Sequence, residues 1–145
     1  MRLKLNFELV PDSCQGDALR HRISKEAWDF LRRDAYKRAD GKCMICGKQH
    51  CRLEAHEKWE YDIDKKVQKL VDIIAVCKDC HSVIHIGRTQ LVGDEERAEK
   101  HFMKVNNCTY SEYRQALGKA NEKHRQLNLI EEWLLDLTFL KKYVD

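Results

Sequence analysis

Four cysteines in two closely spaced pairs carry the clearest chemistry of this sequence. Cys43 and Cys46 form one Cys-x-x-Cys pair, and Cys77 and Cys80 form another after an interval of 30 residues. A tight turn presents both sulfurs of such a pair at one point, and zinc prefers tetrahedral sulfur and nitrogen ligands. The spacing therefore predicts one structural Zn²⁺ held by these four thiolates.

Two other interpretations of the cysteines are weaker. A redox-active dithiol belongs near a βαβ pattern, which this sequence does not show. A disulfide framework is disfavoured because the sequence shows no signal peptide and its cysteine count, seven, is odd. We expect Cys14, Cys51 and Cys108 to be small buried apolar residues, with Cys51, beside His50, as the one substitute ligand.

A pair of histidines directly follows the second cysteine pair. His81 and His85 are four residues apart, so on a helix they share one face and can bind one ion together. A β-hairpin packed against that helix would bring His56 or Glu57 over the same face. The pattern predicts a second metal site in a ββα arrangement, and an exposed polar helix face is the plainer interpretation of the pair.

The elements that must position these residues are two strands and a short helix. We predict a strand over residues 51–61 and an apolar strand over residues 70–76, joined by a charged turn over residues 62–69. The second strand leads directly into a short helix over residues 78–86, which Gly87 is expected to end. This hairpin and helix make up the expected ββα core.

Capping and alternation signals predict the flanking elements. Alternating apolar side chains predict a strand over residues 3–9, and a similar alternation over residues 133–139 predicts a last strand or a buried extended tail. Three helices are expected from their caps: one from Ser24 to Gly41, one from Asp94 to the Asn106-Asn107 break, and one from the Thr109/Glu112 capping box to Leu127.

The expected fold class is α+β, with a zinc-stapled ββα-metal core, flanking helices and short terminal strands. The 145 residues suit a single domain. Within it we expect the core at residues 43–87, an N-terminal strand and helix at residues 1–42, and a helical extension at residues 88–145. No apolar run approaches the length of a membrane span, so we expect a cytoplasmic location and no membrane partner.

The basic residues are concentrated in the first third of the sequence. The net charge is +3, and residues 1–50 carry 11 Lys/Arg against 7 Asp/Glu, a surplus of +4. A basic surface can face phosphates, although a solvated helix face explains the charge as well. The candidate nucleic-acid-binding residues are Arg32, Arg33, Lys37, Arg38, Lys65 and Lys66.

Residues 43–85 resemble the HNH endonuclease superfamily, in the subgroup whose ββα-metal motif is held by two Cys-x-x-Cys pairs. The family pattern runs Cys-x-x-Cys, Leu-Glu-x-His-His, then Asn-Leu-x-x-Leu-Cys-x-x-Cys-His-x-x-x-His. This sequence matches it with Cys43-Met44-Ile45-Cys46, Leu53-Glu54-Ala55-His56-Glu57, and Asp72-Ile73-Ile74-Ala75-Val76-Cys77 through Cys80-His81 to His85. Residues 23–36 and 101–139 are more loosely similar to a bacterial and phage set of such proteins.

The resemblance implies a metal-dependent endonuclease that hydrolyses phosphodiester bonds in DNA, with RNA as the other candidate, in a bacterial cell or a phage-infected host. It implies that His56, His81 and His85 bind a catalytic divalent ion: Mg²⁺, Mn²⁺, Ni²⁺ or Zn²⁺. The general base of the family is a histidine, and Glu57 occupies that position here. Asp72 occupies the position of the family asparagine, which orients the base and braces the hairpin.

The substitution at residue 57 leaves two alternatives open. A carboxylate can serve as a base, but a glutamate beside a divalent cation tends to become a ligand or to stay ionised. In another register His56 would be the base, with Ala55 at the ligand position. The alternative function is a catalytically inactive module on the same scaffold, which binds nucleic acid or a protein partner.

Overall fold

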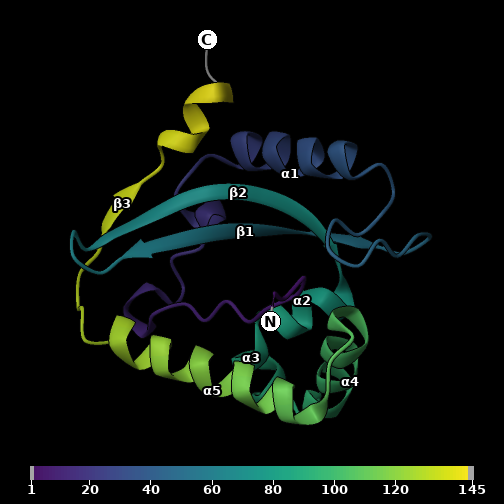
Figure 1. Cartoon of the computed structure of the whole chain (residues 1–145). Helices are drawn as coiled ribbons and strands as arrows, with labels where there is room; N and C mark the ends of the chain where they lie inside the picture. The colour runs from purple at the N-terminus through teal and green to yellow at the C-terminus, as the bar shows by residue number, and fades with distance from the viewer. Residues whose placement is uncertain (1, 144–145) are drawn as a thin grey trace.

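The computed structural model describes residues 2–143 of the chain, and these form an α+β fold (Figure 1). A three-stranded sheet of order β1-β2-β3 lies in the middle, with helices on both faces. Strands β1 (Leu53–Asp62) and β2 (Val67–Cys77) are antiparallel, and the short β3 (Leu134–Asp136) is parallel to β2. The expected α+β class and the central β-hairpin are confirmed.

The hairpin is longer than the sequence predicted. Only residues 63–66 lie between the two strands, whereas a charged turn was expected over residues 62–69. Gln68 is buried and donates to the hydroxyl of Tyr61, so cross-strand pairing extends into a polar stretch. Lys58 pairs with Asp72 and Trp59 pairs with Leu70, which leaves one extra residue in β2 and bends that strand.

Helix α1 (Lys25–Ala39) covers one face of the sheet and begins and ends as predicted. The side chain of Ser24 accepts from the Ala27 N–H at 3.1 Å, and Asp40, in the left-handed conformation, ends the helix before Gly41. Its apolar side packs against alternate residues of β2; the buried residues shared by the two elements are Leu31, Ala35, Ala39, Leu70, Ile73 and Ala75.

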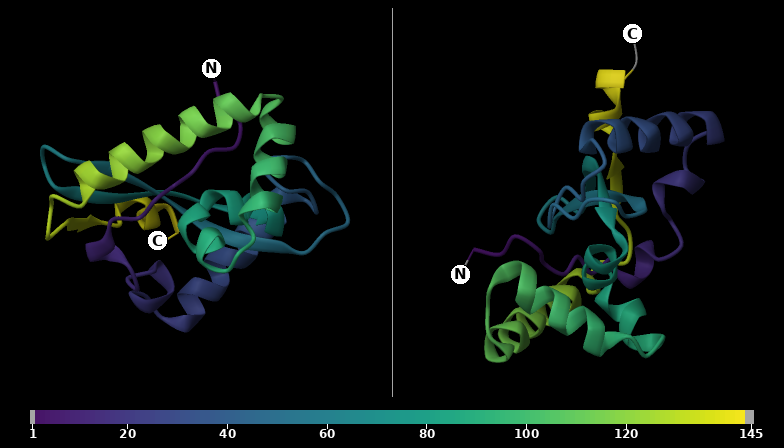
Figure 2. Two further views of the ribbon diagram at one scale, coloured as in Figure 1. Left: turned by 90° about the horizontal axis from the view of Figure 1, so that it is seen from below. Right: turned by 90° about the vertical axis from the view of Figure 1, so that its right-hand side faces the viewer.

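The other α-helices lie on the opposite side of the sheet (Figure 2). They are α2 (Lys78–Ile84), α3 (Ile86–Leu91), α4 (Glu95–Asn106) and α5 (Tyr110–Leu127). Helix α2 contacts β1 and β2, and the remaining helices pack beyond it. The predicted boundaries of α4 and α5 and the Thr109/Glu112 capping box are confirmed, and α4 ends at Asn107, which is left-handed. Asp94 stands at the start of α4, but its side chain makes no capping hydrogen bond. None of the helices in the described part of the chain combines the length and apolar character needed to cross a bilayer.

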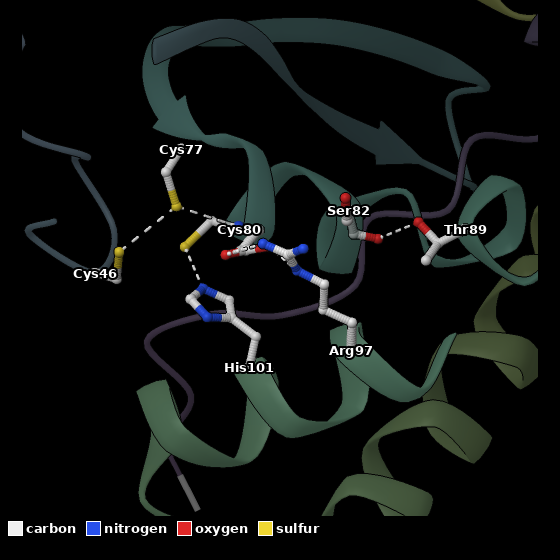
Figure 3. A network of polar contacts seen from close by, with 8 residues as sticks. Cys46, Cys77, Cys80, Ser82, Thr89, Arg97 and His101 are labelled. Atoms are coloured by element: carbon white, nitrogen blue, oxygen red, sulfur yellow. Dashed lines mark hydrogen bonds and ion pairs between the residues drawn. The ribbon is translucent and has the colours of Figure 1, made fainter. Parts of the chain in front are cut away.

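The expected end of the short helix at Gly87 was wrong. Helix α2 ends at His85, whose φ of −98° and ψ of 54° break the helical path, and Gly87 lies inside α3. Thr89 joins the two helices because its hydroxyl donates to the backbone oxygen of Ser82 at 2.6 Å (Figure 3) and also lies 3.1 Å from the backbone oxygen of His85. The break turns the chain just after the last candidate metal ligand.

The strand expected over residues 3–9 was also wrong. Residues 4–12, which we call the N-terminal strap, form no strand and run between the hairpin and α5, with a bend at Lys4 and Leu5 and the start of a 3₁₀ helix at Asp12 (Figure 1). The amide side chain of Asn106 takes the place of a neighbouring strand, since it bonds to the N–H of Lys4 and to both backbone groups of Leu5. At the other terminus, β3 is followed by a 3₁₀ helix, η3 (Thr138–Tyr143).

Three aromatic rings fix the strap to the helices. Phe7 stacks on Phe102 with ring centroids 5.0 Å apart and planes at 6°, and Tyr113 lies edge-on to both rings. Phe102 and Tyr113 are fully buried. This contact joins the start of the chain to α4 and α5, so it ties together segments that are distant in the sequence.

We predict that Phe102→Ala lowers the free energy of unfolding by about 3–5 kcal/mol, because it removes a buried aromatic ring and leaves a cavity. Urea denaturation followed by circular dichroism measures this change. Leu91→Ala is the control: that side chain is 89% exposed, and its loss should change stability by less than about 0.5 kcal/mol. Equal effects of the two substitutions would contradict the assigned core.

Candidate metal centres

The four cysteines of the two pairs meet between the loop after α1 and the junction of β2 with α2. The Sγ atoms of Cys43, Cys46, Cys77 and Cys80 all lie within 4.8 Å of one another. Cys46 and Cys77, one from each pair, have their sulfurs 3.7 Å apart (Figure 3). Three of the four residues are buried and Cys46 is half-buried. Such a buried group of four sulfurs can hold a structural metal such as zinc.

Both pairs have the same local backbone arrangement. The N–H of Cys46 donates to the Cys43 sulfur at 3.5 Å, and the N–H of Cys80 donates to the Cys77 sulfur at 3.4 Å. Gly47, with a φ of 78°, supplies the left-handed turn that closes the first pair. These N–H groups stabilise negative charge on the sulfurs, which is the form that binds a metal.

The cluster already favours a thiolate at Cys43. The Cys80 thiol and nearby backbone N–H groups lower the pKa of Cys43, whereas burial raises the pKa of Cys77. Hydrogen bonding to Cys43, together with burial, raises the pKa of Cys80. A divalent cation compensates this concentration of negative charge and deprotonates coordinating thiols, so the donor set fits Zn²⁺.

The first cysteine pair is attached to the sheet by residues that sequence reasoning did not single out. The N–H of Met44 donates to the backbone oxygen of Ala75 at 2.9 Å, and the Met44 sulfur accepts from the Ala75 N–H. From the other side, Nε2 of His101 on α4 lies 3.2 Å from the Cys80 sulfur (Figure 3). His101 is 21 residues beyond Cys80, and no local spacing pattern indicates it.

The three cysteines outside the pairs lie apart from this cluster. Cys51, the expected substitute ligand, is half-buried, and its sulfur contacts the backbone oxygen of Lys48 at 3.6 Å. His50 beside it is exposed. Cys14 is buried as expected, and Cys108 is half-buried. The four-cysteine group is therefore complete without them.

Three histidines form a second cluster on the α2 side of the hairpin. One nitrogen from each of His56 on β1, His81 on α2 and His85 at the end of α2 lies within 4.8 Å of the others. Their ring centroids are 4.8–5.4 Å apart. His56 is buried, at 3% exposure. The hairpin and helix thus bring the imidazole of β1 to the two imidazoles that follow the second cysteine pair.

Two carboxylates contact this histidine cluster from outside it. Glu54 Oε1 lies 2.7 Å from His81 Nδ1, and Glu8 Oε1 lies 3.0 Å from His56 Nε2. Burial lowers the pKa of His81 despite the Glu54 contact, and burial with the neighbouring imidazoles lowers the pKa of His85 to about 4. His85 is therefore neutral at physiological pH, the form in which imidazole binds metals.

Glu57 and Asp72, the other residues expected at the site, contact neither the histidines nor each other by any hydrogen bond in the described chain. Both carboxylate oxygens of Glu57 lie 3.0 Å from the N–H of Leu19, and Oε1 also accepts from the indole of Trp59. Asp72 accepts from the N–H of Ile73 beside the irregularity in β2. Asp72 therefore braces its own strand.

A pocket of about 130 Å³ adjoins the histidine cluster. His56 and His85 line one part of it, Glu57 lines another, and Lys123 of α5 lies at its wall. The strap and apolar residues of α5 complete the lining. Glu57 thus shares a cavity with two of the histidines although its carboxylate makes its hydrogen bonds elsewhere, to Leu19 and Trp59.

The expected nucleic-acid-binding residues occupy two places away from this pocket. Those on α1 lie across the sheet from the histidines, and several are paired: Arg32 with Asp29 at 2.9 Å, and Arg38 with Asp34 at 2.9 Å. Arg38 also donates to the backbone oxygen of Ile73 at 2.6 Å. Arg33 and Lys37 line a shallow groove with acidic residues, while Lys65 and Lys66 are exposed at the hairpin turn.

No family model, no curated protein and no solved structure matches this chain. The geometry of its own residues is therefore the basis for any assignment.

We predict that the purified protein contains about one zinc per chain and that Cys46→Ser removes it and unfolds the region around the two pairs, because metal binding is coupled to folding. Elemental analysis and circular dichroism measure the two effects. Cys51→Ser is the matched control, a nearby thiol outside the cluster, and should keep the zinc. Loss of zinc without loss of thermal stability would contradict a structural role for the metal.

Proposed function

We propose that this chain is a metal-dependent nuclease of the HNH type that hydrolyses phosphodiester bonds in DNA. The observation that carries the proposal is the grouping of His56, His81 and His85 on a hairpin and helix held together at the four-cysteine cluster. Zinc at the cysteines would be structural, and a second divalent ion at the histidines would be catalytic. Outer carboxylates on two of the imidazoles are typical of metal-binding histidines.

In this proposal, the three histidines bind the ion and Glu57 is the general base. When bound, the ion supplies a Lewis acid for the scissile phosphate and the leaving oxygen. Each carboxylate oxygen has two lone pairs; Oε1 of Glu57 has two hydrogen-bonding partners and Oε2 has one. Oε2 therefore retains an acceptor site for a water proton, and its pocket is shared with His56 and His85.

The substrate class follows from charge and from the pocket. Lys123 lines the pocket, and Arg88 of α3 is near enough for its charge to contribute to the lowered pKa of His81 and His85. Both cations suit a phosphate beside the histidines. Lys65 and Lys66, exposed at the hairpin turn away from the pocket, would contact a more distant part of a polyanion. The paired arginines of α1 would contribute less, because acidic partners already neutralise them.

A second candidate function is a catalytically inactive module that binds nucleic acid or a protein on the same scaffold. The observation in its favour is the state of Glu57, whose carboxylate is committed to the Leu19 N–H and the Trp59 indole. A base that must accept a proton is less effective when its oxygens are already engaged. Cleavage assays separate the two functions.

We predict that the zinc-loaded protein nicks or cuts plasmid DNA when Mg²⁺, Mn²⁺ or Ni²⁺ is added, as measured by gel electrophoresis. His81→Ala and His85→Ala should abolish cleavage while the cysteine-bound zinc and the fold remain. Glu57→Gln should reduce the rate by roughly 10²-fold, because it preserves shape and removes the base. His21→Ala, which removes an exposed histidine outside the cluster, is the control and should have no effect.

Glu57→His decides between the two functions. It restores the base of the family, so an active wild type should keep or gain activity on this substitution. If the wild type is inert with every divalent ion and Glu57→His gains cleavage, the inactive binding module is the correct function.

We predict that DNA binding weakens with salt and that Lys65→Ala/Lys66→Ala lowers the slope of log affinity against log salt by roughly 0.9 for each phosphate that is no longer neutralised. Fluorescence anisotropy over a series of salt concentrations measures the slope. Arg32→Ala should change the slope less, because Asp29 already pairs with Arg32. Binding that does not depend on salt would favour a protein partner.

A further inference from the structure

The N-terminal strap holds one acidic side chain against the histidine cluster. The strap is fixed before that point by Asn106 and by the stacking of Phe7 on Phe102. It is fixed after it by His124, which lies 3.1 Å from the Val10 oxygen. Between these anchors, the N–H of Glu8 donates to the backbone oxygen of Ile84 at 3.0 Å, one residue before His85.

The side chain of Glu8 is directed at His56. Its Oε1 lies 3.0 Å from Nε2 of that ring, and Oε2 lies 3.5 Å from the Lys58 ammonium. A carboxylate oxygen accepts hydrogen bonds, so at 3.0 Å the contact is made by an N–H at Nε2 of His56.

We propose that Glu8 is a positioning residue of the three-histidine centre, which fixes His56 with Nε2 protonated and leaves Nδ1 free for a metal ion. The proposal rests on the proposed metal site but not on DNA cleavage. Glu54 makes the equivalent contact with Nδ1 of His81 and leaves its Nε2 free. Two carboxylates, one from the strap and one from β1, therefore set the ring orientation of two of the three ligands.

The alternative is that Glu8 is a structural ion-pair partner only. His56 is nearly inaccessible, so a buried ring nitrogen needs a hydrogen-bond partner whether or not a metal binds. The two roles differ in what removal of Glu8 does. A structural contact affects stability, whereas a positioning contact also affects the tautomer of His56 and the affinity for an ion.

The test is calorimetric titration of the zinc-loaded protein with Ni²⁺, an ion that imidazole ligands suit. Glu8→Ala should raise the dissociation constant for Ni²⁺ by about 10–100-fold, the usual effect of losing an outer partner of a metal-binding histidine. Glu8→Gln, which keeps an acceptor oxygen, should fall between the wild type and Glu8→Ala. Long-range ¹H–¹⁵N spectra should show the Nε2–H tautomer of His56 in the wild type and a mixture in Glu8→Ala.

Asp12→Asn is the matched control. Asp12 is also a strap carboxylate near an imidazole, 3.4 Å from Nε2 of His124, but that histidine is outside the cluster. Its substitution should leave the Ni²⁺ affinity unchanged. The proposal is overturned if Glu8→Ala binds Ni²⁺ as tightly as the wild type, or if Asp12→Asn weakens binding equally.

The same titration separates this proposal from the nuclease function. A wild type that binds Ni²⁺ but cuts no DNA would refute the nuclease, and the Glu8 variants would still decide the role of Glu8. A wild type that binds no Ni²⁺ at the histidines would refute the positioning role of Glu8, and cleavage with Mg²⁺ or Mn²⁺ would still decide the nuclease function.

Discussion

The attachment of the first cysteine pair to the second is the constraint on which the rest of the structure depends. Cys77 is both the last residue of β2 and the N-cap of α2, where its sulfur accepts from the Cys80 N–H. The turn from strand to helix is therefore fixed at the four-sulfur cluster. Because α2 starts at a fixed point, His81 and His85 are held at a fixed distance from His56 across the hairpin.

Local signals in the sequence were sufficient to predict much of the fold. Ser24, Asn107 and the Thr109/Glu112 box act on backbone groups within a few residues, so helix ends could be predicted from neighbouring residue types. The two Cys-x-x-Cys pairs likewise predicted the grouping of four thiols, because each pair is a single turn. The hairpin was predicted from the strands expected over residues 51–61 and 70–76. Its turn was placed too widely because Gln68, a polar residue, is buried in β2.

The parts that could not be predicted depend on contacts between distant segments. The alternation of apolar and polar residues over residues 3–9 does correspond to burial, since Leu5 and Phe7 are buried. The backbone there, however, bonds to the Asn106 side chain and not to a neighbouring strand. Gly87 was expected to end a helix, yet the break falls at His85, where Thr89 binds two carbonyls. Neither Glu8 nor His101 lies in any recognisable spacing, because each reaches its centre only through the packing of the strap or of α4.

The strap also determines when this site can be assembled. Its anchors on Asn106, His124 and Asn128 are separated from their partners by 101 to 116 residues. Contacts of such long sequence separation form late, both in refolding and as a chain emerges from the ribosome. The cysteine pairs and the hairpin are complete by residue 85, so a nascent chain passes through a stage in which the histidines are present but the strap that carries Glu8 is not yet anchored. The strap can be anchored over His56 at both ends only after α5 has been synthesised.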